Sequence, residues 1–202
     1  MKPAIRKTRK AILILCMLTS SVFAQKRTVL TGDYKNLKGI SAFNVIFDYE
    51  NLTVDKSTEE EFLKDRMDKR EGEKSQQFRE GWFADRQNRY EPKFIESFNK
   101  RFDDGQIKAD KNFPDAKYTM KVKTIWIHPG FNAGVVRSTS AVTFVVSIYE
   151  TANPDNVLLS VEFLKVAGKG AMGFDYNSGY RISESYAKLA KEFANDIRKN
   201  TK

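Results

Sequence analysis

Cysteine and histidine are nearly absent from this sequence: its 202 residues include one cysteine, Cys16, and one histidine, His128. Serine or cysteine hydrolysis needs a nucleophile, a base that is usually histidine, and an orienting group, and no motif around His128 supplies the other two. Metal sites need several His, Cys or carboxylate ligands at fixed spacing, and no such cluster stands out. We therefore predict no catalytic residue, no metal and no cofactor, and expect a structural or surface role for His128.

Acidic residues are missing from the N-terminal end of the chain. The first ten residues carry five bases and no acid, and the apolar stretch AILILCMLTSSVFA follows. This organisation, with an A-x-A-like end, is typical of a secretory signal peptide cleaved after Ala24. The stretch is short for a membrane span, and polar residues 19–21 interrupt it. Because Leu15 rather than a small residue precedes Cys16, the sequence has no lipobox, and we expect Cys16 to be lost with the peptide.

Removal of residues 1–24 changes the bulk properties of the chain. It leaves 202 − 24 = 178 residues without cysteine, and the formal net charge falls from +9 to 9 − 5 = +4. A secreted chain of this length is large enough to be stabilised by burial alone, as one domain. The small remaining charge argues against a nucleic-acid partner. We predict a signal peptide over 1–24, a polar lead segment over 25–40 and a single domain over 41–202.

Four segments alternate between apolar and polar residues, which predicts β-strands. In the first, Phe43, Val45 and Phe47 share one face, and the others lie in AKYTMKVKTIWIH, SAVTFVVSIYE and NVLLSVEFLKV. The second segment changes phase at Ile125, which indicates a bulge or a twist. The last three strands follow one another with short links, so we predict that they form an antiparallel meander.

Amphipathic, highly charged segments predict the helices. Between residues 55 and 111, aromatic residues at helical spacing indicate two or three helices, of which the clearest begins at Pro92. A final helix is predicted to begin at the N-cap Ser183. The predicted fold class is therefore α+β in the order β-α-α-β-β-β-α. Its sheet is mostly antiparallel, with one N-terminal strand and the three-stranded meander, and the helices pack on one face.

Gly168, Gly170 and Gly173 spell G-x-G-x-x-G, the motif of dinucleotide-binding turns. In that fold the glycines lead directly into a helix within a parallel βαβ unit. Here the segment FDYNSGYR separates the last glycine from Ser183, and the preceding strand is predicted to be antiparallel. We reject a dinucleotide site and interpret the glycines as sources of backbone freedom in a long connection.

Two links of the predicted meander leave the sheet at the same end. They are HPGFNAGVVRSTS, after its first strand, and AGKGAMGFDYNSGYR, after its third. Both contain glycine and are longer than tight turns, and aromatic and arginine side chains on such loops are typical binding groups. We predict a binding rim that consists of Phe131, Arg137, Lys169, Phe174, Tyr176, Tyr180 and Arg181.

The chain resembles small secreted envelope proteins of Bacteroidetes-type bacteria. The resemblance lies in the signal peptide, the order of elements and the segments AKYTMKVKTIWI, TFVVSIYETANPDNVLLSVEF and RISESYAKLAKEFANDIRK. More loosely, it is similar to the periplasmic α/β domains of curli-secretion-type lipoproteins. The resemblance implies an α/β envelope domain and supplies no catalytic residue, and the missing lipobox departs from the lipoprotein members.

We expect a non-enzymatic, secreted or periplasmic envelope protein that acts in binding or assembly through contacts with a protein partner. One alternative is a hydrolase of envelope polymers that uses a carboxylate pair, since two such groups meet only in space. Another is a carrier of a small apolar ligand held between the helices and the sheet. We predict no integral span in the mature chain, and peripheral membrane association stays open.

Overall fold

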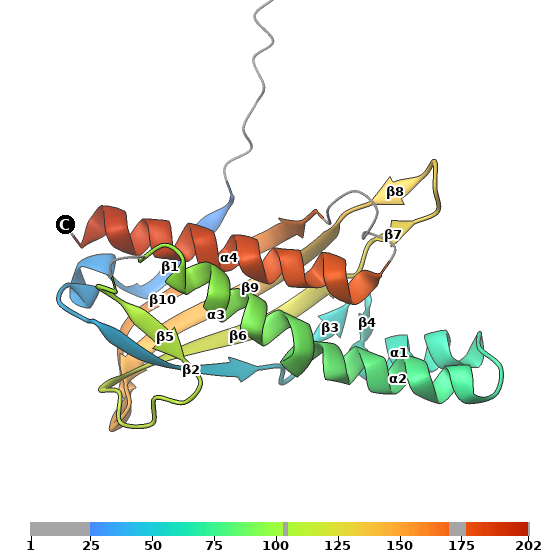
Figure 1. The fold of residues 1–202 in the computed structure, drawn as a ribbon, viewed down its shortest axis with the longest axis horizontal. Helices are drawn as coiled ribbons and strands as arrows, with labels where there is room; N and C mark the ends of the chain where they lie inside the picture. Colours follow the sequence, from blue (N-terminus) through green and yellow to red (C-terminus); the bar gives the residue numbers. More distant parts are fainter. Residues whose placement is uncertain (1–24, 103–104, 170–176, 202) are drawn as a thin grey trace, which may run out of the picture.

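The computed structural model of this protein describes residues 25–102, 105–169 and 177–201 (Figure 1). The predicted signal peptide lies outside these residues. A short 3-10 helix (Tyr34–Leu37), four α-helices and ten strands are found within them. None of the helices in these ranges is both long enough and apolar enough to cross a membrane.

The main sheet contains eight strands of mixed direction (Figure 1). Its path is β1 (Arg27–Gly32), β10 (Asn153–Gly168), β9 (Ser140–Glu150), β6 (Tyr118–His128), β2 (Ala42–Asp48) and β5 (Lys108–Asp110). Beside this path, β3 (Thr53–Val54) pairs with β6, and β4 (Ser57–Thr58) pairs with β3. The pairs β1–β10, β10–β9 and β9–β6 are antiparallel. In contrast, β2 runs parallel to both β5 and β6, and β3 runs parallel to β6.

The predicted fold class is therefore wrong in its sheet. The chain is α+β, but the sheet is a large mixed one rather than a mostly antiparallel sheet built from one strand and a meander. Helices separate β2 from β6 in the sequence, and such a crossover returns the chain parallel to its starting strand. The sequence also gave no sign of β1, which lies in the predicted polar lead and is exposed along its whole length.

The helical segment between β2 and β5 is more continuous than its sequence indicates. After α1 (Glu59–Asp68), a single run comprises α2 (Glu73–Asp85), a π-helical turn (Arg86–Tyr90) and α3 (Glu91–Asn99). The α-helix predicted to begin at Pro92 is α3, which begins one residue earlier, but the helical turns before it were not predicted to be continuous with it. Proline removes a backbone N–H and crowds the preceding turn. The wider π turn directly before Pro92, where the Glu91 N–H donates to the Arg86 carbonyl, accommodates it.

The C-terminal helix α4 (Ser178–Asn200) begins five residues before its predicted start at Ser183. The side chain of Asn177 accepts a hydrogen bond from the Tyr180 N–H and caps the helix. The Ser183 hydroxyl instead donates to the Tyr180 carbonyl from within the first turns. The apolar stripe predicted for this helix is buried, including Tyr186, Leu189 and Phe193.

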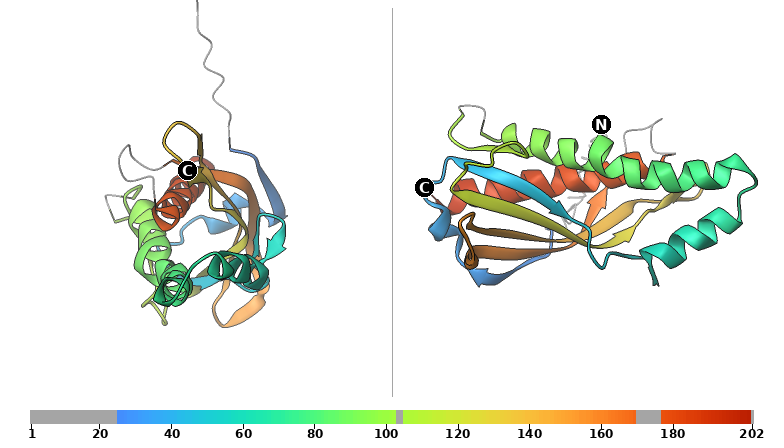
Figure 2. Two further views of the ribbon diagram at one scale, coloured as in Figure 1. Left: turned by 90° about the vertical axis from the view of Figure 1, so that its right-hand side faces the viewer. Right: turned by 90° about the horizontal axis from the view of Figure 1, so that it is seen from below.

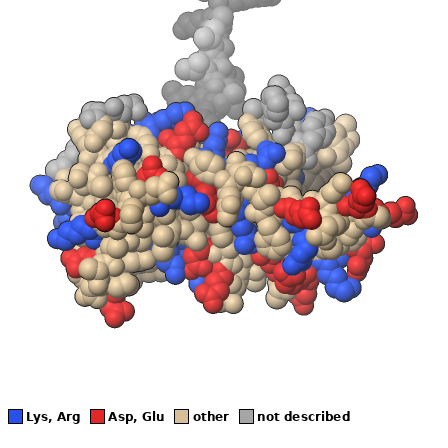
Figure 3. Space-filling model, turned by 60° about the horizontal axis from the view of Figure 1, so that its bottom comes forward, with Lys and Arg blue, Asp and Glu red and all other residues tan. Residues whose placement is uncertain are grey.

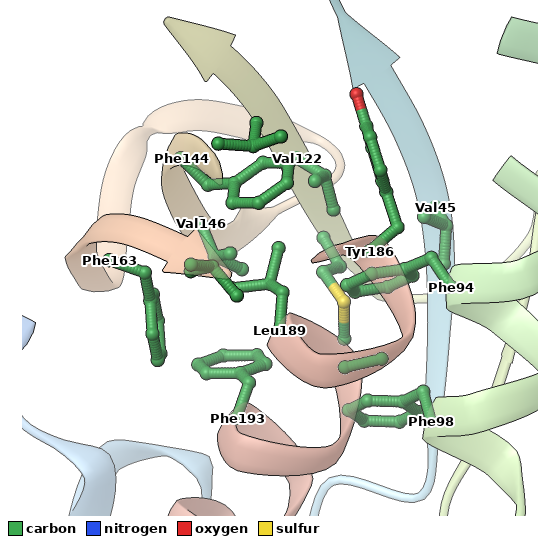
Figure 4. Packing of buried hydrophobic residues seen from close by; sticks show 14 of the residues in the cluster. Val45, Phe94, Phe98, Val122, Phe144, Val146, Phe163, Tyr186, Leu189 and Phe193 are labelled. Carbon is green, nitrogen blue, oxygen red and sulfur yellow. The ribbon is translucent and has the colours of Figure 1, made fainter. Parts of the chain in front are cut away.

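The core lies between the sheet and helices α3 and α4, which cover the same face of the sheet (Figure 2). Phe98 from α3 and Phe193 from α4 meet there, with ring centroids 6.4 Å apart. Phe144 of β9 and Phe163 of β10 reach the same cluster from the sheet (Figure 4). The predicted inward faces of β9 and of α3 are confirmed, since their aromatic members are fully buried.

The phase change predicted at Ile125 is confirmed as a bulge in β6. The pairing of β6 with β9 shifts between Thr124 and Trp126. Before the bulge the buried apolar residues are Met120 and Val122, at even-numbered positions, whereas after it Ile127 is buried and its neighbours are partly exposed. The bulge therefore directs Trp126 and His128 away from the core at the end of the strand.

Candidate functional site

The candidate site occupies one end of the molecule, which we call the hairpin end. It consists of the turn between β3 and β4, residues 128–140 and the first residues of α4. Within residues 128–140, β7 (Phe131–Asn132) and β8 (Arg137–Ser138) pair as a separate two-stranded hairpin. Figure 1 shows this hairpin extending beyond the sheet, at the end of the molecule where α1 and α2 also extend.

Ser140, Gly168 and Arg181 join the two predicted loops at their base. The Ser140 hydroxyl lies 2.7 Å from the carbonyl oxygen of Arg181 and 3.2 Å from that of Gly168. Gly168 is packed so closely that a Cβ atom there would lie 2.1 Å from the Arg181 carbonyl oxygen. The ends of β9 and β10 and the first turns of α4 are thus held in direct contact.

Arg181, one of the predicted rim residues, lies inside the hairpin end with only 5% of its surface exposed. Its guanidinium group donates hydrogen bonds to the carbonyl oxygens of Pro129 and Gly130, at 3.1–3.2 Å. These carbonyls belong to the segment that leads into β7. Arg181 therefore fixes the base of the hairpin to α4.

The other predicted rim residues are distributed around this base. Phe131 is 48% exposed, Arg137 and Lys169 are exposed, and Tyr180 is partly exposed. The Arg137 Nε donates to the Gly134 carbonyl at 3.0 Å, so this side chain stabilises the hairpin turn. Phe174 and Tyr176 lie outside the described residues.

The tip of the hairpin carries two apolar residues that the sequence-based selection missed. Val135 is fully exposed and Val136 is 57% exposed, next to the half-exposed Phe131. Aromatic and basic residues were predicted to form the binding rim because they are typical binding groups. The sequence feature that indicates the tip is instead a pair of β-branched residues directly after Gly134 in a turn segment. The three side chains together expose apolar surface on one protruding element.

A second group of polar side chains at the hairpin end was also missed. His128 Nδ1 lies 2.5 Å from a carboxylate oxygen of Asp55, and His128 Nε2 lies 3.0 Å from the Ser138 hydroxyl. We call these three residues the Asp55–His128–Ser138 relay. The partners are 73 and 10 residues from His128, and they approach it only because β3, β6 and β8 meet here.

Two hydrogen bonds of its backbone fix the position of Asp55, although it lies on a tight turn. Its backbone N–H donates to the Ile127 carbonyl at 2.9 Å, and its own carbonyl accepts from the Trp126 indole at 2.8 Å. Its φ of 55° is left-handed, a conformation that aspartate tolerates better than most residues. The parallel pairing of β3 with β6 therefore places the carboxylate beside His128.

Gly130 allows β8 to approach the end of β6. It has a φ of 65°, and a Cβ atom there would lie 2.4 Å from the Ser138 carbonyl oxygen. A side chain at this position would push β8, and Ser138 with it, away from His128. His128 and Asp55 also line a surface hollow of about 470 Å³ together with Phe62, Arg66 and Trp126.

The start of α4 is fixed by α2 as well. The Asp85 carboxylate lies against Gly179, where a Cβ atom would come within 1.7 Å of Oδ2. Burial raises the pKa of Asp85, although its ion pair with Arg89 acts in the opposite direction. A carboxylate near a helix N-terminus interacts favourably with the helix dipole. The hairpin end thus rests on a rigid junction of two helices and the sheet.

The surroundings of Gly168, the first glycine of the G-x-G-x-x-G motif, differ from those of a dinucleotide-binding turn. Gly168 ends β10, which runs antiparallel to both of its neighbours. The next helix starts at Ser178, ten residues later, and Gly170 and Gly173 lie outside the described residues. A dinucleotide site requires a parallel strand that leads directly into a helix, whereas β10 is antiparallel to its neighbours, as predicted.

Charge is distributed without a dominant sign over the face seen in Figure 3, where basic and acidic side chains alternate. No protein-family model, no curated protein and no solved structure matches this chain. The resemblance to envelope proteins stays a prediction.

Proposed function

We propose that this chain is a secreted or periplasmic protein of the bacterial cell envelope that binds a partner protein through the tip of the β7–β8 hairpin. The observation that carries the proposal is the exposure of Phe131, Val135 and Val136 on one protruding element. A protein partner with an apolar pocket matches this tip better than nucleic acid does, because the exposed residues are uncharged and apolar.

The fixed base of the hairpin supports a binding role. A hairpin of two short strands is only marginally stable by itself. Here the hydrogen bonds from Arg181 and the close approach of Gly130 to β8 hold its base against α4 and the sheet. A tip that is ordered before binding loses less conformational entropy when a partner covers it, and more of the contact free energy then appears as affinity.

Replacement of both tip valines by serine is the first test. We expect the Val135→Ser/Val136→Ser variant to bind the partner at least about tenfold more weakly, since loss of an apolar anchor costs about 1.4 kcal/mol or more. The partner is first identified by a photo-crosslinking amino acid placed at position 135 in intact cells. The affinity of the purified pair is then measured by calorimetry.

Two residues of β1 provide a matched control. Val29 and Leu30 are 47% and 53% exposed, close to the 57% of Val136, but lie on the edge strand β1 of the main sheet and not in the hairpin. The Val29→Ser/Leu30→Ser variant should bind with unchanged affinity. Equal weakening by both double variants, or crosslinks from position 30 to the same partner, would contradict binding through the hairpin tip.

The proposed secretion of the chain is tested separately, through its single cysteine. Cleavage after Ala24 removes Cys16, so the mature chain should start at Gln25 and contain no thiol. We expect the chain recovered from the periplasm or the medium to have the mass of residues 25–202 and to resist labelling by a maleimide. A maleimide-reactive, full-length chain in the membrane fraction would show that the N-terminal segment is retained.

A further inference from the structure

We propose that the Asp55–His128–Ser138 relay is a catalytic site at which Ser138 acts as the nucleophile in ester hydrolysis. In this proposal His128 is the general base, and Asp55 is a positioning residue that orients the imidazole ring. The proposed binding role of the hairpin tip neither requires nor predicts this activity. It also differs from the carboxylate-pair hydrolase, because it uses the one histidine of the chain.

The hydrogen-bond directions agree with this assignment. An ionised carboxylate only accepts hydrogen bonds, so the Asp55 contact at 2.5 Å requires the hydrogen on His128 Nδ1. The lone pair of Nε2 is then free to accept from the Ser138 hydroxyl, which lies at 3.0 Å. A nucleophile within hydrogen-bond reach of a base, with the base oriented by a third group, is the arrangement that activates serine.

Exposure of the relay also favours a catalytic role over a structural one. The side chains of His128 and Asp55 are 33% and 42% exposed, so water would satisfy their polar atoms if the relay were absent. Exposed ion pairs contribute little to stability. Nevertheless three separate segments converge on the imidazole ring, and the Trp126 ring stacks near it at an interplanar angle of 15°. The relay is both accessible to a substrate and held in place.

The reaction balances without any group from outside the chain except water. Ser138 Oγ forms a bond to the carbonyl carbon of the ester, and its proton moves to His128 Nε2. The bond to the leaving oxygen breaks, and the leaving alcohol takes that proton. Water then gives a proton to Nε2 and its oxygen to the acyl carbon, and the released Ser138 regains the proton. The products are one carboxylic acid and one alcohol.

The exposure of the site to water determines which class of substrate we propose. Amide hydrolysis requires strong stabilisation of the oxyanion and protonation of a poor leaving group, both of which depend on exclusion of water. Esters with a good leaving group, such as aryl esters, depend less on either. We therefore assign small carboxylic esters of phenol-like alcohols as the substrates, and p-nitrophenyl acetate is the probe for them.

Two measurements on the purified chain of residues 25–202 test the proposal. We expect a fluorophosphonate to label Ser138, identified by peptide mass spectrometry, and p-nitrophenyl acetate to be hydrolysed. Ser138→Ala should abolish the labelling, and His128→Gln should slow hydrolysis by about 10²–10⁴-fold, the usual contribution of a general base. Asp55→Asn should also slow it. We expect the rate of the unchanged protein to increase with pH and this increase to be lost in His128→Gln.

The controls separate catalysis from folding and from partner binding. Ser41→Ala changes an exposed serine outside the hairpin end and should leave labelling and hydrolysis unchanged. If His128→Gln unfolds, Ser138→Ala and Asp55→Asn still decide the question, because thermal unfolding checks each variant. Labelling at other serines only, or hydrolysis equal to that of Ser138→Ala, would overturn the proposal. Ser138→Ala should not change binding at the hairpin tip, so either proposal can fail alone.

Discussion

Replacement of Phe193 by alanine is expected to lower the free energy of unfolding by about 3–5 kcal/mol, the usual cost of truncating a fully buried phenylalanine. The Phe193 side chain is fully buried where three elements meet. Its ring packs edge-on against Phe163 of β10, with centroids 6.1 Å apart, and lies 6.4 Å from Phe98 (Figure 4). The ring of Tyr34 lies 6.1 Å away. Truncation leaves a cavity that none of these rings is able to fill without disturbing the others.

Urea unfolding followed by circular dichroism measures this loss, and an unchanged m-value would show that the transition stays two-state. Phe131→Ala is the control with the same chemical change. Since Phe131 is 48% exposed, its truncation should change the free energy by no more than about 0.5 kcal/mol. If Phe193→Ala does not fold, Phe193→Leu should still lose about 1.5 kcal/mol. A loss below about 1 kcal/mol for Phe193→Ala would show that the core does not depend on this ring.

The sequence predicted which side chains are buried much better than it predicted which strands pair. Phe94 and Phe98 recur on one helical face and Val142 and Phe144 on one strand face, and all four are fully buried. Periodicity reports burial because a helix or strand must place one face against the core. It carries no information on the direction of a neighbouring strand, and for that reason the parallel pairing of β2 with β6 was missed.

Two other differences have local causes. The strand β1 was not predicted because it is an edge strand exposed along its length, so burial imposes no alternation on its residues. The start at Pro92 was predicted from the preference of proline for the first helical turn. In the structure, the π turn at Arg86–Tyr90 allows the helix to continue through this proline, and a π turn has no sequence signature of its own.

From the sequence, only the location of the candidate site could be predicted, and not the contacts that its residues make. The loops that carry Phe131 and Arg181 do meet through Ser140, but Arg181 is buried and holds the loop base. The relay was out of reach, because His128 meets Asp55 and Ser138 through strand pairings that the sequence does not encode locally. The sequence has no motif around His128, because its partners Asp55 and Ser138 belong to other segments of the chain.

The first glycine of the rejected motif gives the second prediction with a large effect. Gly168→Ala is expected to lower the free energy of unfolding by about 3 kcal/mol, at the upper end of the cost of overpacking. The added Cβ would lie 2.1 Å from the Arg181 carbonyl oxygen, 2.4 Å from Ser140 Oγ and 2.6 Å from Ser185 Oγ. The nearest of these is a backbone atom of α4, so relief of the clash requires a shift of the helix relative to the end of β10.

Gly81 in α2 is the matched control for Gly168. It is exposed, its backbone is helical, and no atom outside its own stretch of helix lies within 4 Å of where its Cβ would be, so Gly81→Ala should stabilise the chain by about 0.5–1 kcal/mol. Urea unfolding should show a lower free energy of unfolding for Gly168→Ala and a higher one for Gly81→Ala. A shift of α4 would also displace the Arg181 hydrogen bonds at the hairpin base, so Gly168→Ala should weaken partner binding as well. Equal stability of the two variants would show that α4 does not pack on Gly168. The packing that we expect to hold the base of the hairpin in place would then be absent.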